Sequence, residues 1–256
     1  MRKLTGPVID FLLAWQLLTS VPLPFSVPTS NRPAGYGAAY YPLVGLILGG
    51  LLALAAEAFY FLLPGSIAAT LLLALWVALT GMLHLDGFMD SCDGLLPPRD
   101  RERRLEIMKD SRVGAFGVVG GVLLLLLKFN ALAALPPATR WVALLAAPML
   151  GRWAQQFAMR RYPLARPGGM GAFFMQGQSW LRVAISSVGV LVILGLLFGA
   201  AGLLLAAVTW LVTALVARFA VGRIGGLTGD VYGALCETVE TVLLVMAAGL
   251  AAWGVV

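Results

Sequence analysis

Long apolar runs dominate the chain and alternate with short polar segments. Seven of these runs approach the length of about 20 residues that a helix needs to cross a bilayer. They are 40–63, 67–83, 113–135, 141–157, 183–198, 203–221 and 239–255. The pattern predicts an all-α, polytopic integral membrane bundle of about seven transmembrane helices, within a range of six to eight. The weaker apolar stretch 8–21 predicts a half-span or an interfacial helix.

Basic residues are concentrated in alternate loops, and loops rich in lysine and arginine stay on the cytoplasmic side of a membrane. If the N-terminus is cytoplasmic, the 18 basic residues all fall in inner segments except Arg140 and Lys128. Arg140 lies in an outer segment and Lys128 within a span. We therefore expect a cytoplasmic N-terminus and an inner-membrane protein. The net charge of +6 then follows from membrane topology and requires no nucleic-acid partner.

The composition supports a membrane protein. Hydrophobic residues make up 60% and charged residues 12% of the 256 positions, against about 45–50% and 25% in soluble domains. Since no polar block is long enough to form a soluble domain, we expect one membrane-embedded domain over 1–256. The two cysteines do not form a paired framework and predict neither a disulfide nor a zinc site.

Three aspartates follow one of the apolar runs. Asp86, Asp90 and Asp93 have the spacing i, i+4, i+7, which places them on one face of a helix. Their charges repel one another unless a cation lies between them. Carboxylates suit magnesium or manganese, and magnesium usually combines a few carboxylates with substrate phosphates. The row predicts a metal that bridges the protein and a nucleotide diphosphate; the alternative is a solvated helix end.

The only histidine, His84, precedes these aspartates by two residues. It is a candidate general base for an attacking hydroxyl, or a supporting group, and the alternative is a structural hydrogen-bonding histidine. Further along, the segment 109–114 leads into the next span as an anion-receiving helix start does. Glu106 and Asp110 add two more possible ligands there.

Two further charged segments lie near or within the predicted spans. A lysine in mid-span costs about 2.5–3.5 kcal/mol on insertion scales, so Lys128 should face the interior and pair with an acid or a phosphate. A structural ion pair is the alternative. In 223–240, four glycines predict a loop whose amides can face an anion. Glu237 and Glu240 follow at i, i+3, and the alternative for the loop is a tight turn.

Together these motifs resemble the cobalamin synthase family, the adenosylcobinamide-GDP ribazoletransferases. The resemblance covers 17–240. It is carried by His84-Leu85-Asp86-Gly87, Asp90-x-x-Asp93-Gly94, Arg104-x-Glu106-Ile107-Met108-Lys109-Asp110-Ser111-Arg112-x-Gly114, Gly226-x-Thr228-Gly229-Asp230-x-x-Gly233-Ala234, Glu237, Glu240 and Tyr41-Pro42-Leu43-Val44-Gly45.

The resemblance implies a reaction in which adenosylcobinamide-GDP and α-ribazole, or its 5′-phosphate, yield adenosylcobalamin, or its 5′-phosphate, and GMP with Mg²⁺ as cofactor. On this hypothesis Asp86, Asp90 and Asp93 hold the metal. Asp110 completes the metal site or acts as base, and His84 orients or deprotonates the hydroxyl. The expected substrate and phosphate ligands are Lys109, Arg112, Lys128, Thr228, Gly229, Asp230, Glu237 and Glu240, with the two glutamates also candidates for a second metal.

Two other classes remain open at this point. Asp90-x-x-Asp93-Gly94 also resembles the start of the CDP-alcohol phosphotransferase motif, but 95–98 departs from the rest of that motif. An ion-coupled transporter would use Lys128 and acids near the bilayer midplane, where only Glu57 is found. We expect contact with membrane lipid, and either a homo-oligomer or association with other cobalamin-assembly enzymes.

Overall fold

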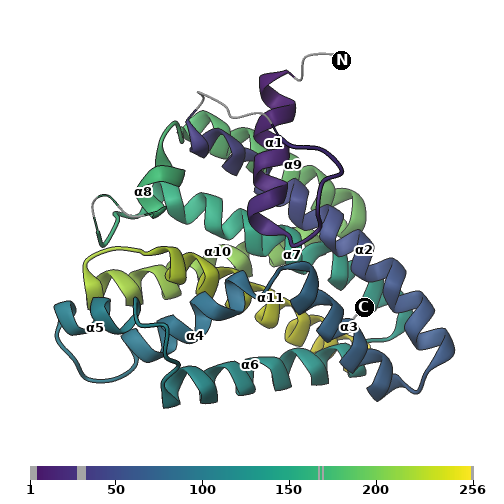
Figure 1. Ribbon diagram of the computed structural model, residues 1–256. Coiled ribbons are helices and arrows are strands. Elements are labelled where there is room, and N and C mark those ends of the chain that lie inside the picture. Colours follow the sequence, from purple (N-terminus) through teal and green to yellow (C-terminus); the bar gives the residue numbers. More distant parts are fainter. Residues whose placement is uncertain (1–4, 28–32, 167, 169, 255–256) are drawn as a thin grey trace.

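The computed structural model describes residues 5–27, 33–166, 168 and 170–254, and its regular elements in these ranges are helices (Figure 1). In chain order they are α1 (Gly6–Leu18), the 3₁₀ helix η1 (Ala34–Tyr40), α2 (Tyr41–Leu62), α3 (Gly65–Leu79), α4 (Leu83–Leu95), α5 (Arg101–Ile107), α6 (Ala115–Ala134), α7 (Pro137–Arg161), α8 (Met170–Met175), α9 (Trp180–Phe198), α10 (Ala201–Ile224) and α11 (Gly229–Ala252). The predicted all-α class is confirmed.

Within the described ranges, five helical stretches are long and apolar enough to cross a membrane, namely η1 with α2, α6, α9, α10 and α11. The pair α3 and α4 adds a sixth if it is counted as one span broken by an 89° bend. The predicted multi-pass architecture is therefore confirmed. The predicted span 141–157 lies in α7, whose 25 residues are long enough. However, α7 carries three polar residues that are buried in the bundle, Arg152, Gln155 and Gln156. These residues make the helix too polar to count among the apolar spans.

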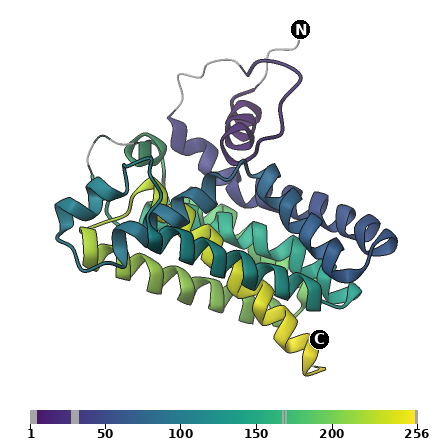
Figure 2. The same cartoon turned by 60° about the horizontal axis from the view of Figure 1, so that its bottom comes forward.

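The bend between α3 and α4 corrects the predicted span 67–83. The helix ends at Leu79, and the chain turns through Gly81 and Met82, which both have positive φ values of 59° and 60°. As a result α4 begins a new direction just before His84. The weaker apolar stretch forms α1, a helix of 13 residues that packs on η1 and α2 and is seen nearly end-on in Figure 2.

Glycines allow the central helices to approach closely. At Gly49 of α2, a Cβ atom would lie 2.9 Å from the Cα of Leu145 in α7. Where α4 crosses α11, a Cβ on Gly87 would lie 2.9 Å from the carbonyl oxygen of Asp230, and one on Gly233 equally near that of His84. Small residues at crossings bring helix backbones together, and here they bring the acid-bearing parts of α4 and α11 together.

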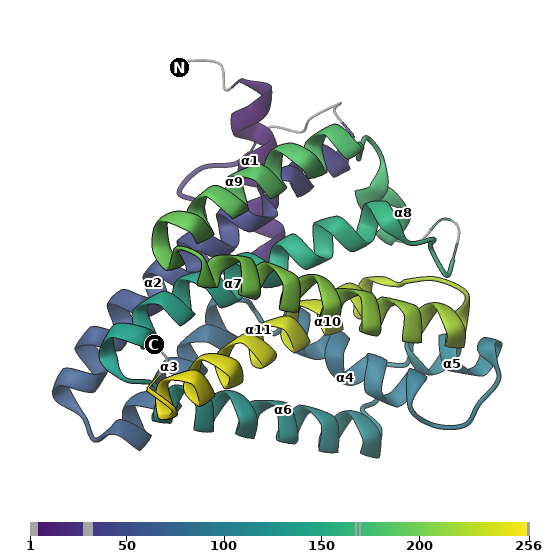
Figure 3. The same cartoon turned by 180° about the vertical axis from the view of Figure 1, so that it is seen from behind.

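The loops rich in arginine meet at one end of the bundle, where α5, the start of α6 and the end of α10 lie (Figures 1 and 3). Arg101 of α5 donates to the carbonyls of Ile224 (2.9 Å) and Ala165 (2.7 Å). Leu164 and Leu227 form an isolated parallel bridge beside them. The cytoplasmic assignment of this end stays a prediction, and its N-terminal contributors Arg2, Lys3 and Arg32 lie outside the described residues.

Candidate functional site

The predicted row of aspartates lies on a single helix, α4. Asp86 is exposed, Asp90 is half-buried and Asp93 is buried. Asp90 lies within electrostatic range of the other two and of Asp230, in the first turn of α11. The fold therefore adds a fourth carboxylate from the distant C-terminal part of the chain. Asp86, Asp90 and Asp230 are called the acid cluster below.

Asp93 caps the start of α6. Its Oδ2 accepts the backbone N–H of Gly114 (2.7 Å), and its Oδ1 accepts that of Gly117 (2.8 Å). A carboxylate is stabilised at a helix N-terminus by these free amides and by the helix dipole. The start of α6 was predicted to receive an anion. In the structure, the carboxylate of Asp93 occupies this position. The role of Asp93 as a metal ligand stays a prediction.

A cavity of about 290 Å³, with four charged residues in its lining, opens beside this cap. Its lining residues are Asp93, Pro97, Arg99, Ile107, Asp110, Arg112, Gly114, Ala115 and Phe116. Arg112 Nη2 lies 2.6 Å from Asp110 Oδ2. The hydrogen bonds from Arg112 lower the pKa of the Asp110 carboxyl to about 2. Since a carboxylate that binds protons so weakly is a poor general base, the geometry favours Asp110 as the partner that orients Arg112. Lys109 is exposed nearby.

The predicted glycine loop is shorter than expected. Asp230 already belongs to α11, and Thr228 caps this helix by accepting the N–H of Val231 at 3.3 Å. The Thr228 hydroxyl also donates to Asp230 Oδ2 (3.1 Å), while Gly229 is exposed. The Leu227 amide donates to the carbonyl of Pro163 (2.8 Å). That amide is thus occupied by tertiary structure and is not free for an anion.

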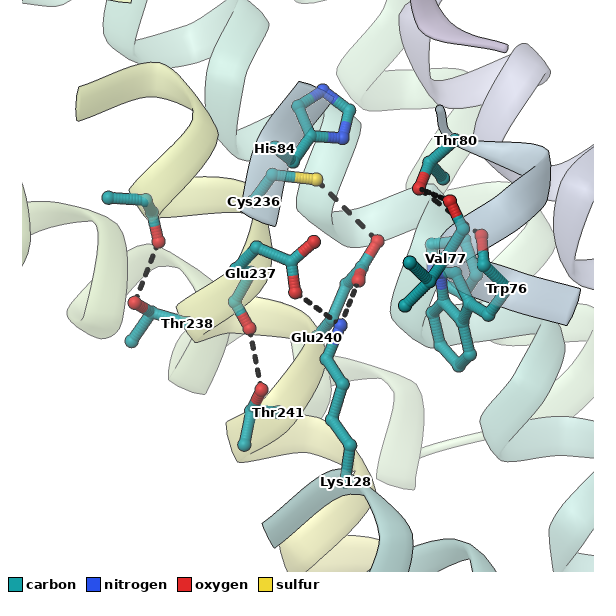
Figure 4. A network of polar contacts seen from close by, with 12 residues as sticks. Trp76, Val77, Thr80, His84, Lys128, Cys236, Glu237, Thr238, Glu240 and Thr241 are labelled. Carbon is teal, nitrogen blue, oxygen red and sulfur yellow. Dashed lines mark hydrogen bonds and ion pairs between the residues drawn. The ribbon is translucent and has the colours of Figure 1, made fainter. Parts of the chain in front are cut away.

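Lys128 faces the bundle interior, as predicted. Its Nζ lies 2.6 Å from Glu237 Oε2 and 2.6 Å from Glu240 Oε2, and 4.7 Å from the centroid of the Trp76 ring. Figure 4 shows the two glutamates converging on the lysine, with His84 beyond them at the top of the view. The predicted pairing of Lys128 with an acid is confirmed. Phosphate or ribazole binding by these three residues stays a prediction, because the structure shows them bonded to one another.

Arg152 is the residue that the sequence analysis missed. It was counted among the basic residues of the inner segments, but it lies in the middle of α7 and is fully buried. Its guanidinium pairs with Glu240, and its Nη2 lies 3.4 Å from His84 Nδ1. The available signal was an arginine inside an apolar run, which marks an interior position for the same reason as Lys128. Lys128, Arg152, Glu237 and Glu240 form the buried ion network.

The acid cluster fits a hard divalent cation by its chemistry. Among the described residues Asp86 and Asp90 take part in no ion pair, so their charges have no fixed counter-ion in the protein. The described residues also contain no group of three His, Cys, Asp or Glu side chains arranged to hold a metal alone. Magnesium suits such a partial set, because it is usually bound by one or two carboxylates and by substrate phosphates.

The sequence matches the family described as cobalamin-5-phosphate synthase over residues 10–248. The chain belongs to this family. Similar curated proteins are the adenosylcobinamide-GDP ribazoletransferases of Roseiflexus sp. (strain RS-1), Desulforamulus reducens and Stutzerimonas stutzeri. Their identities are 40%, 42% and 45%, and the matches cover 95%, 90% and 93% of this chain and 90%, 92% and 97% of theirs.

Family membership decides between the classes that the sequence left open. The match covers the predicted motifs from α4 to α11. Neither a CDP-alcohol phosphotransferase nor an ion-coupled transporter is supported. Glu57, the deep acid that suited a transporter, accepts a hydrogen bond from Trp141 Nε1 at 2.6 Å. No solved structure matches the chain.

Proposed function

We propose that this protein is a transferase that joins adenosylcobinamide-GDP to α-ribazole or α-ribazole 5′-phosphate. A ribazole hydroxyl oxygen attacks the phosphorus on the cobinamide side of the diphosphate. A new phosphorus–oxygen bond forms, the phosphoanhydride bond breaks, GMP leaves with the bonding electrons, and the hydroxyl proton is released to water. The observation that carries the proposal is the family match over 10–248, together with an acid cluster at the end of the bundle where the arginines gather.

The acid cluster is the proposed metal site. Asp86 and Asp90 would hold Mg²⁺ together with substrate phosphates, and Asp230, which lies within electrostatic range of both, would add negative charge beside it. A bound Mg²⁺ neutralises charge on the phosphates and on the leaving group. Asp93, predicted as the third ligand, would serve differently. By capping α6 it fixes the face of α4 that carries the other two aspartates, and it borders the cavity where the diphosphate would enter.

The cavity beside α6 is the proposed phosphate and guanosine subsite. Arg99 and Arg112 line it, and a guanidinium matches the planar, bidentate geometry of phosphate oxygens. Lys109 adds an exposed positive charge at the same end of the bundle. Thr228 and Gly229 lie at the start of α11 beside Asp230, where the helix dipole favours an anion.

The setting of the enzyme is part of the proposal. The arginine-rich end would face the cytoplasm of an inner membrane, where phosphorylated substrates are found, while the apolar helices contact lipid. Association into homo-oligomers or with other cobalamin-assembly enzymes is compatible with such a membrane position. None of these features requires nucleic acid.

The direct test is GMP release by the purified full chain in lipid nanodiscs. Adenosylcobinamide-GDP, α-ribazole and Mg²⁺ are supplied together, and each is left out in turn. We expect GMP and the joined corrinoid in equal amounts, and only with all three present. GMP release that does not depend on α-ribazole would indicate hydrolysis and would contradict the proposed transfer.

A further inference from the structure

Arg152 and His84 are in contact at the centre of the bundle. Arg152 is fully buried and His84 is 2% exposed. One guanidinium nitrogen, Nη1, pairs with Glu240, while Nη2 faces His84 Nδ1 at 3.4 Å. The contact links α7 to α4 and, through Glu240, to α11. It therefore connects the buried ion network to His84, two residues before the row of aspartates.

The chemistry of the two groups fixes which histidine atom carries the ring proton. A guanidinium has only donors and keeps its charge in proteins. The ring nitrogen that faces it must therefore present a lone pair, so the ring proton lies on Nε2.

We propose that Arg152 is a positioning residue that holds His84 as a neutral hydrogen-bond donor through Nε2. The Nε2 atom is buried and has no hydrogen-bond partner among the described residues. It offers its N–H to an oxygen acceptor, and in the reaction this is a phosphoryl or hydroxyl oxygen of the substrate. This assignment replaces the general-base hypothesis for Nε2. The donor role in turnover rests on the proposed function, whereas the tautomer does not.

The chain itself provides a specific probe, because it contains one histidine. Full-length protein labelled with ¹⁵N-histidine, purified through a tag without histidine and placed in nanodiscs, gives ring signals from His84 alone. Nitrogen NMR distinguishes the protonated nitrogen from the unprotonated one, and couplings to the ring protons assign each. We expect one neutral species with the proton on Nε2. A proton on Nδ1, or on both nitrogens, would overturn the proposal.

Substitutions then test whether Arg152 is the cause. Arg152→Met removes every donor and should give a mixture of both tautomers, whereas Arg152→Lys keeps a charged donor and should restore the Nε2–H form. Arg161→Met, at the exposed end of the same helix, is the matched control and should leave the spectrum unchanged. An unchanged Nε2–H spectrum in Arg152→Met would refute the positioning role.

The spectra and GMP release together keep the inference independent of folding and of the proposed reaction. Arg152→Met leaves Glu240 with Lys128 as its one ion-pair partner among the described residues and can fail to fold, but the wild-type and Arg152→Lys spectra still decide the tautomer. In GMP release, kcat should fall in Arg152→Met with KM unchanged and recover in Arg152→Lys. If wild-type protein makes no GMP, the proposed function fails, while the spectrum still tests the tautomer.

Discussion

Two groups of acids lie along α4 and α11 and differ in what balances their charge. Glu237 and Glu240 are buried and bonded to cationic side chains. Asp86 and Asp90 are more exposed and form no ion pair with any residue that the structure describes, and Asp230 lies near them. The same functional group thus serves two purposes. Where the protein supplies the cation, the carboxylate holds helices together; where it does not, the carboxylate is available to a ligand.

The largest effect on turnover is expected in the acid cluster. Asp90→Asn removes one proposed metal ligand with little change in shape, so GMP release should fall about 10³-fold, which is near 4 kcal/mol of transition-state stabilisation. The melting temperature should stay the same. Glu102→Gln, an exposed acid in α5 at the same end, is the control and should keep full activity. Near-normal turnover in Asp90→Asn would remove this residue from the metal site.

Substitutions in the buried ion network should instead lower the stability of the protein. Lys128→Met leaves two buried carboxylates with too little positive charge, and breaking such a pair costs about 3–5 kcal/mol. We expect a clear loss of thermal stability and of protein in the membrane. The double variant Lys128→Met/Glu237→Gln restores the charge balance and should recover part of the loss. A double variant no more stable than the single one would contradict charge pairing as the role of this lysine.

A smaller effect is expected where α6 is capped. A Cβ on Gly117 would collide with the Asp93 carboxylate and lie 3.0 Å from the carbonyl of Met89. Gly117→Ala should therefore displace Asp93 and lower turnover about tenfold, equivalent to 1.4 kcal/mol. Gly189→Ala in α9 meets nothing within 4 Å and should be neutral or slightly stabilising. If both alanine variants behave alike, the cap does not support the site.

The smallest effects are expected at the surface pair beside the cavity. Arg112→Gln should raise KM for adenosylcobinamide-GDP by about tenfold with a lesser change in kcat, and Asp110→Asn should raise it less. The Arg112 guanidinium lowers the pKa of Asp110 to about 2, so the carboxylate stays charged above that value. The KM of Asp110→Asn divided by the KM of the wild type should therefore be constant from pH 5 to 9. A change of this ratio with pH in that range would contradict the pairing of Asp110 with Arg112.

The sequence predicted most of the helices because membrane spans depend on a long apolar pattern that is local in the chain. It also placed Asp86, Asp90 and Asp93 on one helix by their spacing. It could not show that Asp93 caps α6, since this contact joins two helices through a loop. It could not show that Asp230 approaches the row, because that depends on the close crossing at Gly87 and Gly233.

The role of Arg152 was hidden for a similar reason. Its position within α7 was readable from the sequence, but its partners Glu240 and His84 come from α11 and α4. Charge counting assigned it to the inner side of the membrane as one more basic residue. Only the packing of three helices shows that it is enclosed by the protein. The sequence shows that a charged residue lies within an apolar run, but only the fold shows whether that charge is buried.

Metal binding tests the central claim most directly, namely that the acid cluster takes a divalent cation and the buried ion network does not. Mn²⁺ is titrated as a probe for Mg²⁺ into the purified full chain with GMP present, and the free ion is followed by electron paramagnetic resonance. We predict saturable binding by wild-type protein and by Glu102→Gln, and its loss in Asp86→Asn/Asp90→Asn. Binding by the double variant as tight as that of wild-type protein would contradict the account.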